Sequence, residues 1–153
     1  MTLDSFNGSL EDLARLTGLQ QLELWYDGRI PAPTIGDLFG FEMVELSDGQ
    51  VTFAMTPDER MMNPLGTVHG GIAATLLDSA MACAVHSSLP PGSTYTTAQL
   101  NVHYLRAMQP GVGPVRATGT VIHRGRKQST AEGKLIGPDG KLIAHGTTVC
   151  LIL

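Results

Sequence analysis

The residues best suited to chemistry stand together in the segment NPLGTVHGG, residues 63–71. The pattern that follows predicts that Gly70 begins a helix, and the first N–H groups of a helix have no acceptor within it. These free N–H groups and the helix dipole favour a negatively charged oxygen at that point. Because Gly70 and Gly71 have no side chains, a substrate carbonyl could approach the backbone closely. The segment therefore predicts an oxyanion hole, although a tight loop-to-helix junction would also use two glycines.

Asp78 is the second residue with evident chemical potential, because it lies in the middle of the most apolar helix that the sequence predicts. An unpaired carboxylate is costly in apolar surroundings. Such a charge is either a salt-bridged structural residue or a functional group. A functional carboxylate at this position could attack a carbonyl carbon or activate a water molecule.

The predicted elements that position these residues are one long helix and six strands. Apolar residues recur at i, i+1, i+4 and i+5 from Gly70 to about Ser87, which is typical of a buried helix. Before it, two short apolar-rich runs, 41–46 and 50–55, flank the hairpin signal Ser47-Asp48-Gly49. After it come four extended segments, residues 94–106, 115–124, 127–136 and 141–153. We expect an α+β fold, ββαββββ, with an antiparallel six-stranded sheet wrapped around the helix.

Residues 1–40 precede this pattern and predict a short helical extension. Ser9 is placed to cap a first helix, which Gly18 would stop. A second short helix is expected from about Leu19 to Tyr26. We therefore divide the chain into an N-terminal extension, 1–40, and one main domain, 41–153.

The composition of the 153-residue chain, with 42% hydrophobic and 16% charged residues, favours a folded domain over a disordered one. No apolar run approaches the roughly 20 residues that a membrane span needs, and the first residues lack the pattern of a secretory signal. We therefore expect a cytoplasmic protein that does not enter a membrane. Cys83 and Cys150 lack metal-ligand spacing, which predicts free thiols and no metal site.

The charge of the chain is unevenly distributed. The net charge is −4, yet residues 101–153 hold seven basic and two acidic residues. A local basic region on an acidic protein argues against general nucleic-acid binding, which usually accompanies a high isoelectric point. One small anionic ligand suits this distribution better.

The motif resembles that of the hotdog-fold acyl-CoA thioesterases, most closely the phenylacetic-acid-degradation type. The resemblance covers about residues 38–153. It depends on the pattern Asn63, five residues, His69-Gly70-Gly71, six residues, Asp78, and on Tyr104-Leu105-Arg106 at the end of the next strand. Ala107 departs from the family, which often has proline after this arginine.

The resemblance implies hydrolysis of an acyl-CoA to a carboxylic acid and CoA, with no cofactor. It assigns Asp78 as nucleophile or general base, the Gly70 N–H as oxyanion donor, and His69 as the residue that orients the loop and the thioester. It also implies that Thr97 lies near the attacking water, although neighbouring Thr96 leaves the register open. Asn63 either hydrogen-bonds to substrate or water, or forms an ordinary Asn-Pro turn.

The basic residues supply candidates for binding the CoA phosphates. Arg124, Arg126 and Lys127 form a predicted hairpin turn, and Arg106 ends an earlier strand. An exposed hairpin kept soluble by its charge is the alternative. Gly71 would let the substrate approach the backbone beside them.

The sequence leaves two alternative functions to consider, a second kind of enzyme and a non-catalytic binding module. A hotdog enoyl-CoA hydratase would need a His a few residues after the acidic residue, but Cys83 stands five positions after Asp78. A non-catalytic acyl-CoA-binding module would be expected to lack the carboxylate.

Helix geometry also predicts the assembly. Gly70 and Asp78 lie about 12 Å apart along one helix, too far for both to reach one reacting centre. We therefore expect a homodimer with shared sites, further assembled into a tetramer as a dimer of dimers. For the acyl group we can name only candidates, among them Trp25 and Tyr26 of the extension, which either cover the pocket or belong to ordinary core.

Overall fold

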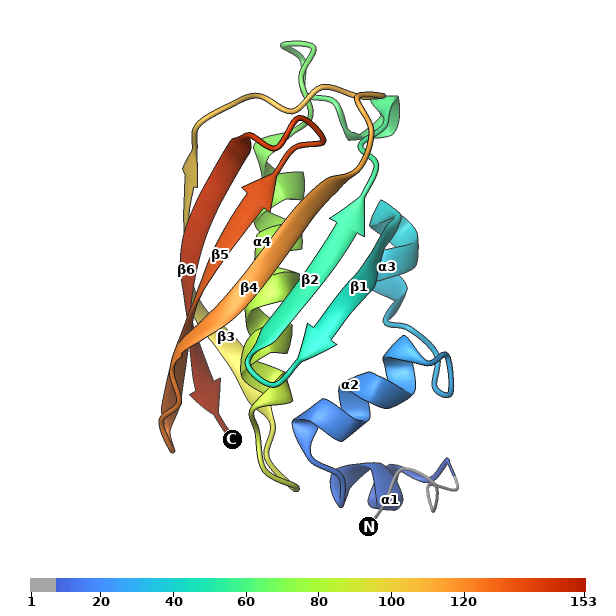
Figure 1. Cartoon of the computed structure of the whole chain (residues 1–153), viewed down its shortest axis with the longest axis vertical. Helices are drawn as coiled ribbons and strands as arrows, with labels where there is room; N and C mark the ends of the chain where they lie inside the picture. Colours follow the sequence, from blue (N-terminus) through green and yellow to red (C-terminus); the bar gives the residue numbers. More distant parts are fainter. Residues whose placement is uncertain (1–7) are drawn as a thin grey trace.

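The structure, a computed structural model, describes residues 8–153. Residues 1–7, which include the start of the predicted extension and the segment examined for a secretory signal, lie outside the described residues. The chain forms one six-stranded antiparallel sheet in the order β1-β2-β4-β5-β6-β3, curled around a central helix (Figure 1). The strands are β1 (Phe41–Ser47), β2 (Gln50–Met55), β3 (Tyr95–Tyr104), β4 (Val115–His123), β5 (Gln128–Ile136) and β6 (Leu142–Ile152).

The central helix α4 (Gly70–Ser87) has the bounds that its apolar pattern predicts. Leu76, Leu77, Ala80 and Met81 are fully buried against the sheet, so the core lies between α4 and the inner face of the strands. The expected α+β order, ββαββββ, is confirmed. Within residues 8–153, no helix is long and apolar enough to cross a membrane.

The extension contains three short helices, α1 (Leu10–Ala14), α2 (Gly18–Tyr26) and α3 (Thr34–Phe39). Ser9 caps α1 as predicted, with its hydroxyl accepting a hydrogen bond from the Asp12 N–H at 3.0 Å. The prediction that Gly18 stops this helix is wrong, because α1 ends at Ala14 and Gly18 begins α2. Thr17 and Gln20 form a capping box at the start of α2. The sequence-based prediction missed it because a glycine such as Gly18 is typical of a helix stop.

Only glycine fits at position 18, because the backbone of α2 there lies directly against the end of α4. A methyl group on Gly18 would overlap the carbonyl oxygen of His86, and the Gly18 N–H donates to the Leu89 carbonyl at 3.0 Å. Leu22 of α2 belongs to the main hydrophobic core. The extension therefore packs against the C-terminal half of α4, beside β1 (Figure 1). The division of the chain at residue 40 stays a prediction.

A second close approach fixes the depth of α4 against the sheet. A methyl group on Gly119 of β4 would overlap the Ala80 carbonyl and lie 2.5 Å from the Met81 nitrogen. These are backbone atoms of two fully buried residues of α4, which cannot move without displacing the core. The contact lies two residues from Asp78, so Gly119 also fixes where that carboxylate stands relative to the sheet.

We predict that Gly119→Ala lowers the free energy of unfolding by about 1–3 kcal/mol or more, the usual cost of overpacking. Gly133→Ala is the matched comparison, because its methyl group would meet a side-chain atom, Met81 Cγ, at 2.9 Å. A flexible methionine can move aside, so this variant should lose less stability. Urea unfolding of both variants measures the difference. Equal losses would contradict the assigned role of Gly119.

Candidate functional site

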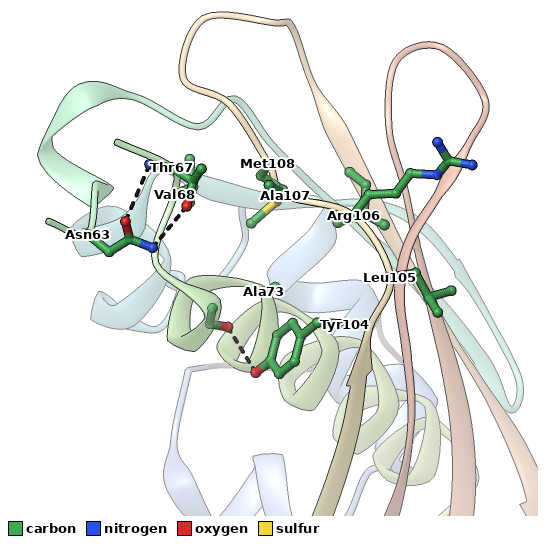
Figure 2. A pocket seen from close by; sticks show the side chains of 11 residues that line it. Asn63, Thr67, Val68, Ala73, Tyr104, Leu105, Arg106, Ala107 and Met108 are labelled. Carbon is green, nitrogen blue, oxygen red and sulfur yellow. Dashed lines mark hydrogen bonds between the residues drawn. The ribbon is translucent and has the colours of Figure 1, made fainter. Parts of the chain in front are cut away.

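The N-terminus of α4 presents a free backbone donor. Among residues 8–153 the Gly70 N–H has no hydrogen-bond acceptor. Tyr104, at the end of β3, packs its ring against Gly70, so a methyl group there would lie 3.3 Å from the Tyr104 ring. The Tyr104 hydroxyl donates to the Gly70 carbonyl at 3.1 Å (Figure 2). The sequence motif marks Tyr104 but gives no sign of this positioning contact.

His69 and Gly71 act as a pair at the same helix end. The Gly71 N–H donates to His69 Nδ1 at 2.9 Å, so the exposed imidazole caps α4. Nδ1 accepts a hydrogen bond, and a neutral ring must therefore carry its proton on Nε2. Any side chain on Gly71 would crowd His69 Nδ1, at 3.0 Å from the added methyl. Gly71 thus makes room for the His69 cap of the helix. A contact between Gly71 and the substrate stays a prediction.

Asn63 shapes the loop before the helix. Its Oδ1 accepts hydrogen bonds from the N–H groups of Leu65 at 2.9 Å and Thr67 at 3.3 Å. Its Nδ2 donates to the Thr67 hydroxyl at 2.9 Å (Figure 2). This is the turn-forming alternative that the Asn-Pro pair suggested. One Nδ2 hydrogen is still available, so a bond from Asn63 to the substrate stays a prediction.

A cavity of about 310 Å³ lies at the N-terminal end of α4. Asn63, Gly70, Tyr104 and Arg106 contribute to its wall. Arg106 is exposed, and its guanidinium extends along the rim away from Asn63 (Figure 2). The cavity therefore combines a free N–H donor with a cation at its edge.

Asp78 lines a different and larger cavity of about 470 Å³, between α4 and the N-terminal extension. Its side chain is half-buried, and burial raises the pKa of the carboxyl group. A hydrogen bond from the Thr97 hydroxyl, 3.1 Å from Oδ1, opposes that rise. Within residues 8–153, Asp78 forms no ion pair. The salt-bridged alternative therefore lacks a basic partner in the described chain.

An irregularity in β3 brings Thr97 to Asp78. Thr97 pairs with Cys150 and Gln99 pairs with Val149, so Ala98 is an extra residue in the ladder. Thr97 is partly buried, whereas Thr96 is exposed. The structure thus settles the register that the sequence left open. The role of Thr97 near the attacking water stays a prediction.

The sulfur and phenol groups beside Asp78 are poor nucleophiles. Burial, with the nearby Asp78 charge, raises the pKa of the Cys83 thiol to about 12. Burial also raises the pKa of the Tyr95 hydroxyl above its usual value. Both groups stay protonated near neutral pH, and both cysteines are free thiols. Neither group therefore competes with the Asp78 carboxylate as a nucleophile in this cavity.

The predicted phosphate-binding hairpin lies at the opposite end of α4 from Gly70. Arg124 and Arg126 line a small cavity with Ser88, just beyond the end of the helix. Arg124 pairs with Asp48 at 2.9 Å, and Lys127 is exposed. Within one chain about 25 Å of helix separates the hairpin from Gly70. Only Arg106 of the basic set shares the Gly70 cavity, and phosphate binding by all four residues stays a prediction.

Comparison with known proteins finds the thioesterase superfamily model matching residues 65–144. A Halobacterium salinarum protein named as an esterase is 35% identical over 117 residues, covering 73% of this chain and 76% of the relative. Human acyl-coenzyme A thioesterase 13 is 32% identical over 107 residues, covering 68% and 74%. A solved phenylacetic acid degradation-related protein from Ralstonia eutropha JMP134 superimposes with a TM-score of 0.77 at 28% identity, covering 84% and 97%.

The wrapped helix and these matches define a hotdog-fold hydrolase that acts on thioesters. The chain belongs to the thioesterase superfamily, and the resemblance to its phenylacetic-acid-degradation type is confirmed.

The contact between Thr97 and Asp78 predicts a pH effect. A hydroxyl that donates to a carboxylate stabilises the charged form. Thr97→Val should therefore raise the pKa of Asp78 further and move the acid limb of kcat/KM for thioester hydrolysis to higher pH. Thr96→Val, on the same strand but exposed, is the control and should leave the limb in place. A pH–rate profile that Thr97→Val does not move would show that the hydroxyl does not support the carboxylate.

Proposed function

We propose that the chain hydrolyses acyl-CoA thioesters to a carboxylic acid and CoA. One observation supports this above others: the half-buried Asp78 carboxylate has no ion pair in residues 8–153 and faces a largely apolar cavity. The name of the human relative, which refers to acyl-coenzyme A, supports CoA as the thiol. This chemistry needs neither metal nor cofactor, because a thiolate leaves readily.

The proposed reaction uses two groups of the protein on one carbonyl. The Gly70 N–H stabilises the oxyanion that forms when the carbonyl carbon is attacked. Asp78 either removes a proton from the attacking water or attacks the carbon itself, forming an anhydride that water then cleaves. In both routes the C–S bond breaks, CoA leaves as the thiolate, and water supplies the oxygen of the acid.

The distance between these groups supports a shared site in a homodimer. Gly70 and Asp78 are about 12 Å apart along α4, and they line different cavities. An oxyanion donor and an attacking carboxylate must both lie within about 3–3.5 Å of the reacting atoms. A second copy whose α4 runs antiparallel would bring its Asp78 to the Gly70 of the first, as two-fold symmetry permits.

The exposed edge of the sheet supports the same dimer. β3 lies at one end of the strand order, so one side of its backbone is unpaired. An unpaired edge strand is a ready site for pairing with another chain. Pairing β3 with β3 of a second copy would join the two sheets and set the two α4 helices antiparallel. Assembly of such dimers into a tetramer, and a cytoplasmic location, remain predictions.

The antiparallel dimer would also place the basic hairpin of one copy near the Gly70 cavity of the other. With Asp78 of the second copy level with Gly70, the end of the second α4 extends about 13 Å past Gly70. The hairpin of Arg124, Arg126 and Lys127 in that copy would then lie beyond the Gly70 cavity, on the side where Arg106 stands. A CoA molecule leaving the reacting centre could pair its phosphates with both groups.

Asp78→Asn tests the proposed function. The variant removes the acid–base or nucleophilic group with little change in volume, so kcat for acyl-CoA hydrolysis should fall at least about a hundredfold. Free CoA, detected with a thiol reagent across a set of acyl-CoAs, measures the rate. Near-normal turnover by Asp78→Asn would contradict the catalytic role of Asp78. A wild-type protein that binds acyl-CoA but does not hydrolyse it would instead be the non-catalytic binding module. Hydration of an enoyl-CoA without release of CoA would indicate the hydratase.

The same variant should retain or gain stability. Burial raises the pKa of Asp78, so the protonated form stabilises the fold at low pH, and that contribution is lost as the pH rises through the folded-state pKa. A neutral amide avoids the buried charge and can still accept from Thr97. Melting temperatures at neutral pH should therefore be equal to or higher than those of the wild type, and the difference should shrink in acid. A clear loss of stability would mean that the activity loss reflects unfolding.

Complementation tests the shared site. Gly70→Pro removes the N–H donor at the first helical position, which suits the backbone of proline, and His69 already has the extended backbone that precedes proline. The exposed Tyr104 ring, 3.3 Å from the added Cβ, must shift slightly to admit it. Refolding this inactive chain together with the Asp78→Asn chain should restore about a quarter of wild-type activity if chains pair at random in a two-fold dimer.

Each variant refolded alone is the control and should stay inactive. Heterodimers that are present and folded but show no recovered activity would mean that Gly70 and Asp78 do not meet across an interface.

A further inference from the structure

The cavity that contains Asp78 has two unlike walls. One wall belongs to α4 and β3 and carries Asp78 and Thr97. The facing wall consists largely of the N-terminal extension, with Leu22 and Trp25 of α2 and Ile35 of α3. Among residues 8–153, Asp78 is the one carboxylate in the lining, and most of the remaining lining is apolar. A carboxylate at the edge of an apolar cavity is an arrangement suited to an acyl thioester, with the carbonyl at Asp78 and the chain beyond it.

The cavity extends along α4 from Asp78 towards the C-terminal end of the helix. His86 also lines it, two helical turns beyond Asp78, which is about 12 Å along the axis. His86 Nε2 lies 3.0 Å from Gln21 Oε1. Gln21 in turn donates to the carbonyls of Leu13 and Leu16, at 3.1 and 3.2 Å. This polar pair joins the extension to α4 about 12 Å from Asp78 along the helix.

Trp25 lines the cavity and packs against the hydrophobic core behind it. Its ring centroid lies 5.7 Å from that of Phe53 on β2, a fully buried side chain. The neighbouring Tyr26 turns away, is half exposed, and donates to the Val44 carbonyl at 3.2 Å. The sequence could not distinguish the roles of Trp25 and Tyr26, but the structure gives the two residues different surroundings. Trp25 lines the cavity and Tyr26 does not.

We propose that the N-terminal extension selects the acyl group, with Trp25 as the specificity-determining residue and the His86–Gln21 pair as the far boundary of the cavity. The proposal rests on the proposed hydrolysis of acyl-CoA. The preferred substrates are apolar acyl groups of intermediate length that fill the space between Asp78 and His86. Longer chains meet the joined extension and helix and are hydrolysed less efficiently.

The test is the dependence of kcat/KM on acyl length, from butanoyl-CoA to hexadecanoyl-CoA, in wild type and three variants. Trp25→Ala widens the cavity and should raise the ratio of long-chain to intermediate-chain kcat/KM by about tenfold or more, because one methylene accepted or rejected is worth about 10–200-fold. Ile35→Trp narrows the cavity from an exposed position and should lower that ratio. Tyr26→Ala, on the same helix but outside the cavity, is the matched control and should keep the wild-type profile.

Binding separates this proposal from the proposed hydrolysis. Calorimetric titration of the acyl-CoA series into the Asp78→Asn protein, with and without Trp25→Ala, reports acyl selection without turnover. If the wild type hydrolyses acyl-CoAs but Trp25→Ala and Ile35→Trp change all rates by one factor, the extension does not select the acyl group while the hydrolase assignment stands. If no acyl-CoA is hydrolysed but binding still changes with length as expected, the hydrolase assignment fails and the cavity assignment stands. Since Ile35 is 45% exposed, Ile35→Trp keeps the test valid even if Trp25→Ala unfolds.

Discussion

The rise of an α-helix is the constraint on which the other features depend. Gly70 and Asp78 belong to one rigid, buried helix, so their separation of about 12 Å cannot be closed by any local adjustment. The fold presents the free N–H in one cavity and the carboxylate in another. On the proposed function, each chain would carry two incomplete halves of a reaction centre, and the unpaired edge of β3 is the surface on which two such chains would be joined.

The carboxylate on α4 has an energetic cost that the surrounding packing must offset. Burial disfavours the charged form of Asp78, and Thr97 compensates only in part. On the side of α4 that faces the sheet, the neighbouring Leu76, Leu77 and Ala80 are apolar and fully buried. Gly119 lets the sheet approach the helix backbone directly. Tight apolar packing on one side of α4 therefore supports an unfavourable but reactive group on another.

The sequence predicts features that depend on local pattern and misses those that depend on distant contacts. The bounds of α4 follow from a repeat of apolar residues, and the hairpin at Gly49 follows from its turn residues. The bulge at Ala98 depends on pairing with β6, which no local pattern of β3 encodes. Gly18 looked like a helix stop because its partner, the His86 carbonyl, is 68 positions away. The cap between His69 and Gly71 was local, and the spacing of an imidazole two residues before a glycine could have indicated it.

The way the extension is attached bears on how such an enzyme could diversify. Gly18 and Gln21 fasten α2 to the end of the central helix, whereas Pro31, Pro33 and Ile35 face the cavity from exposed positions. Prolines fix φ and offer no N–H to the core, so this stretch keeps its path with little support from neighbours. Substitutions there could remodel the bound acyl group's surroundings without disturbing the catalytic helix. On the proposed function, the acyl-binding wall could thus change while the helix that carries the carboxylate stays the same.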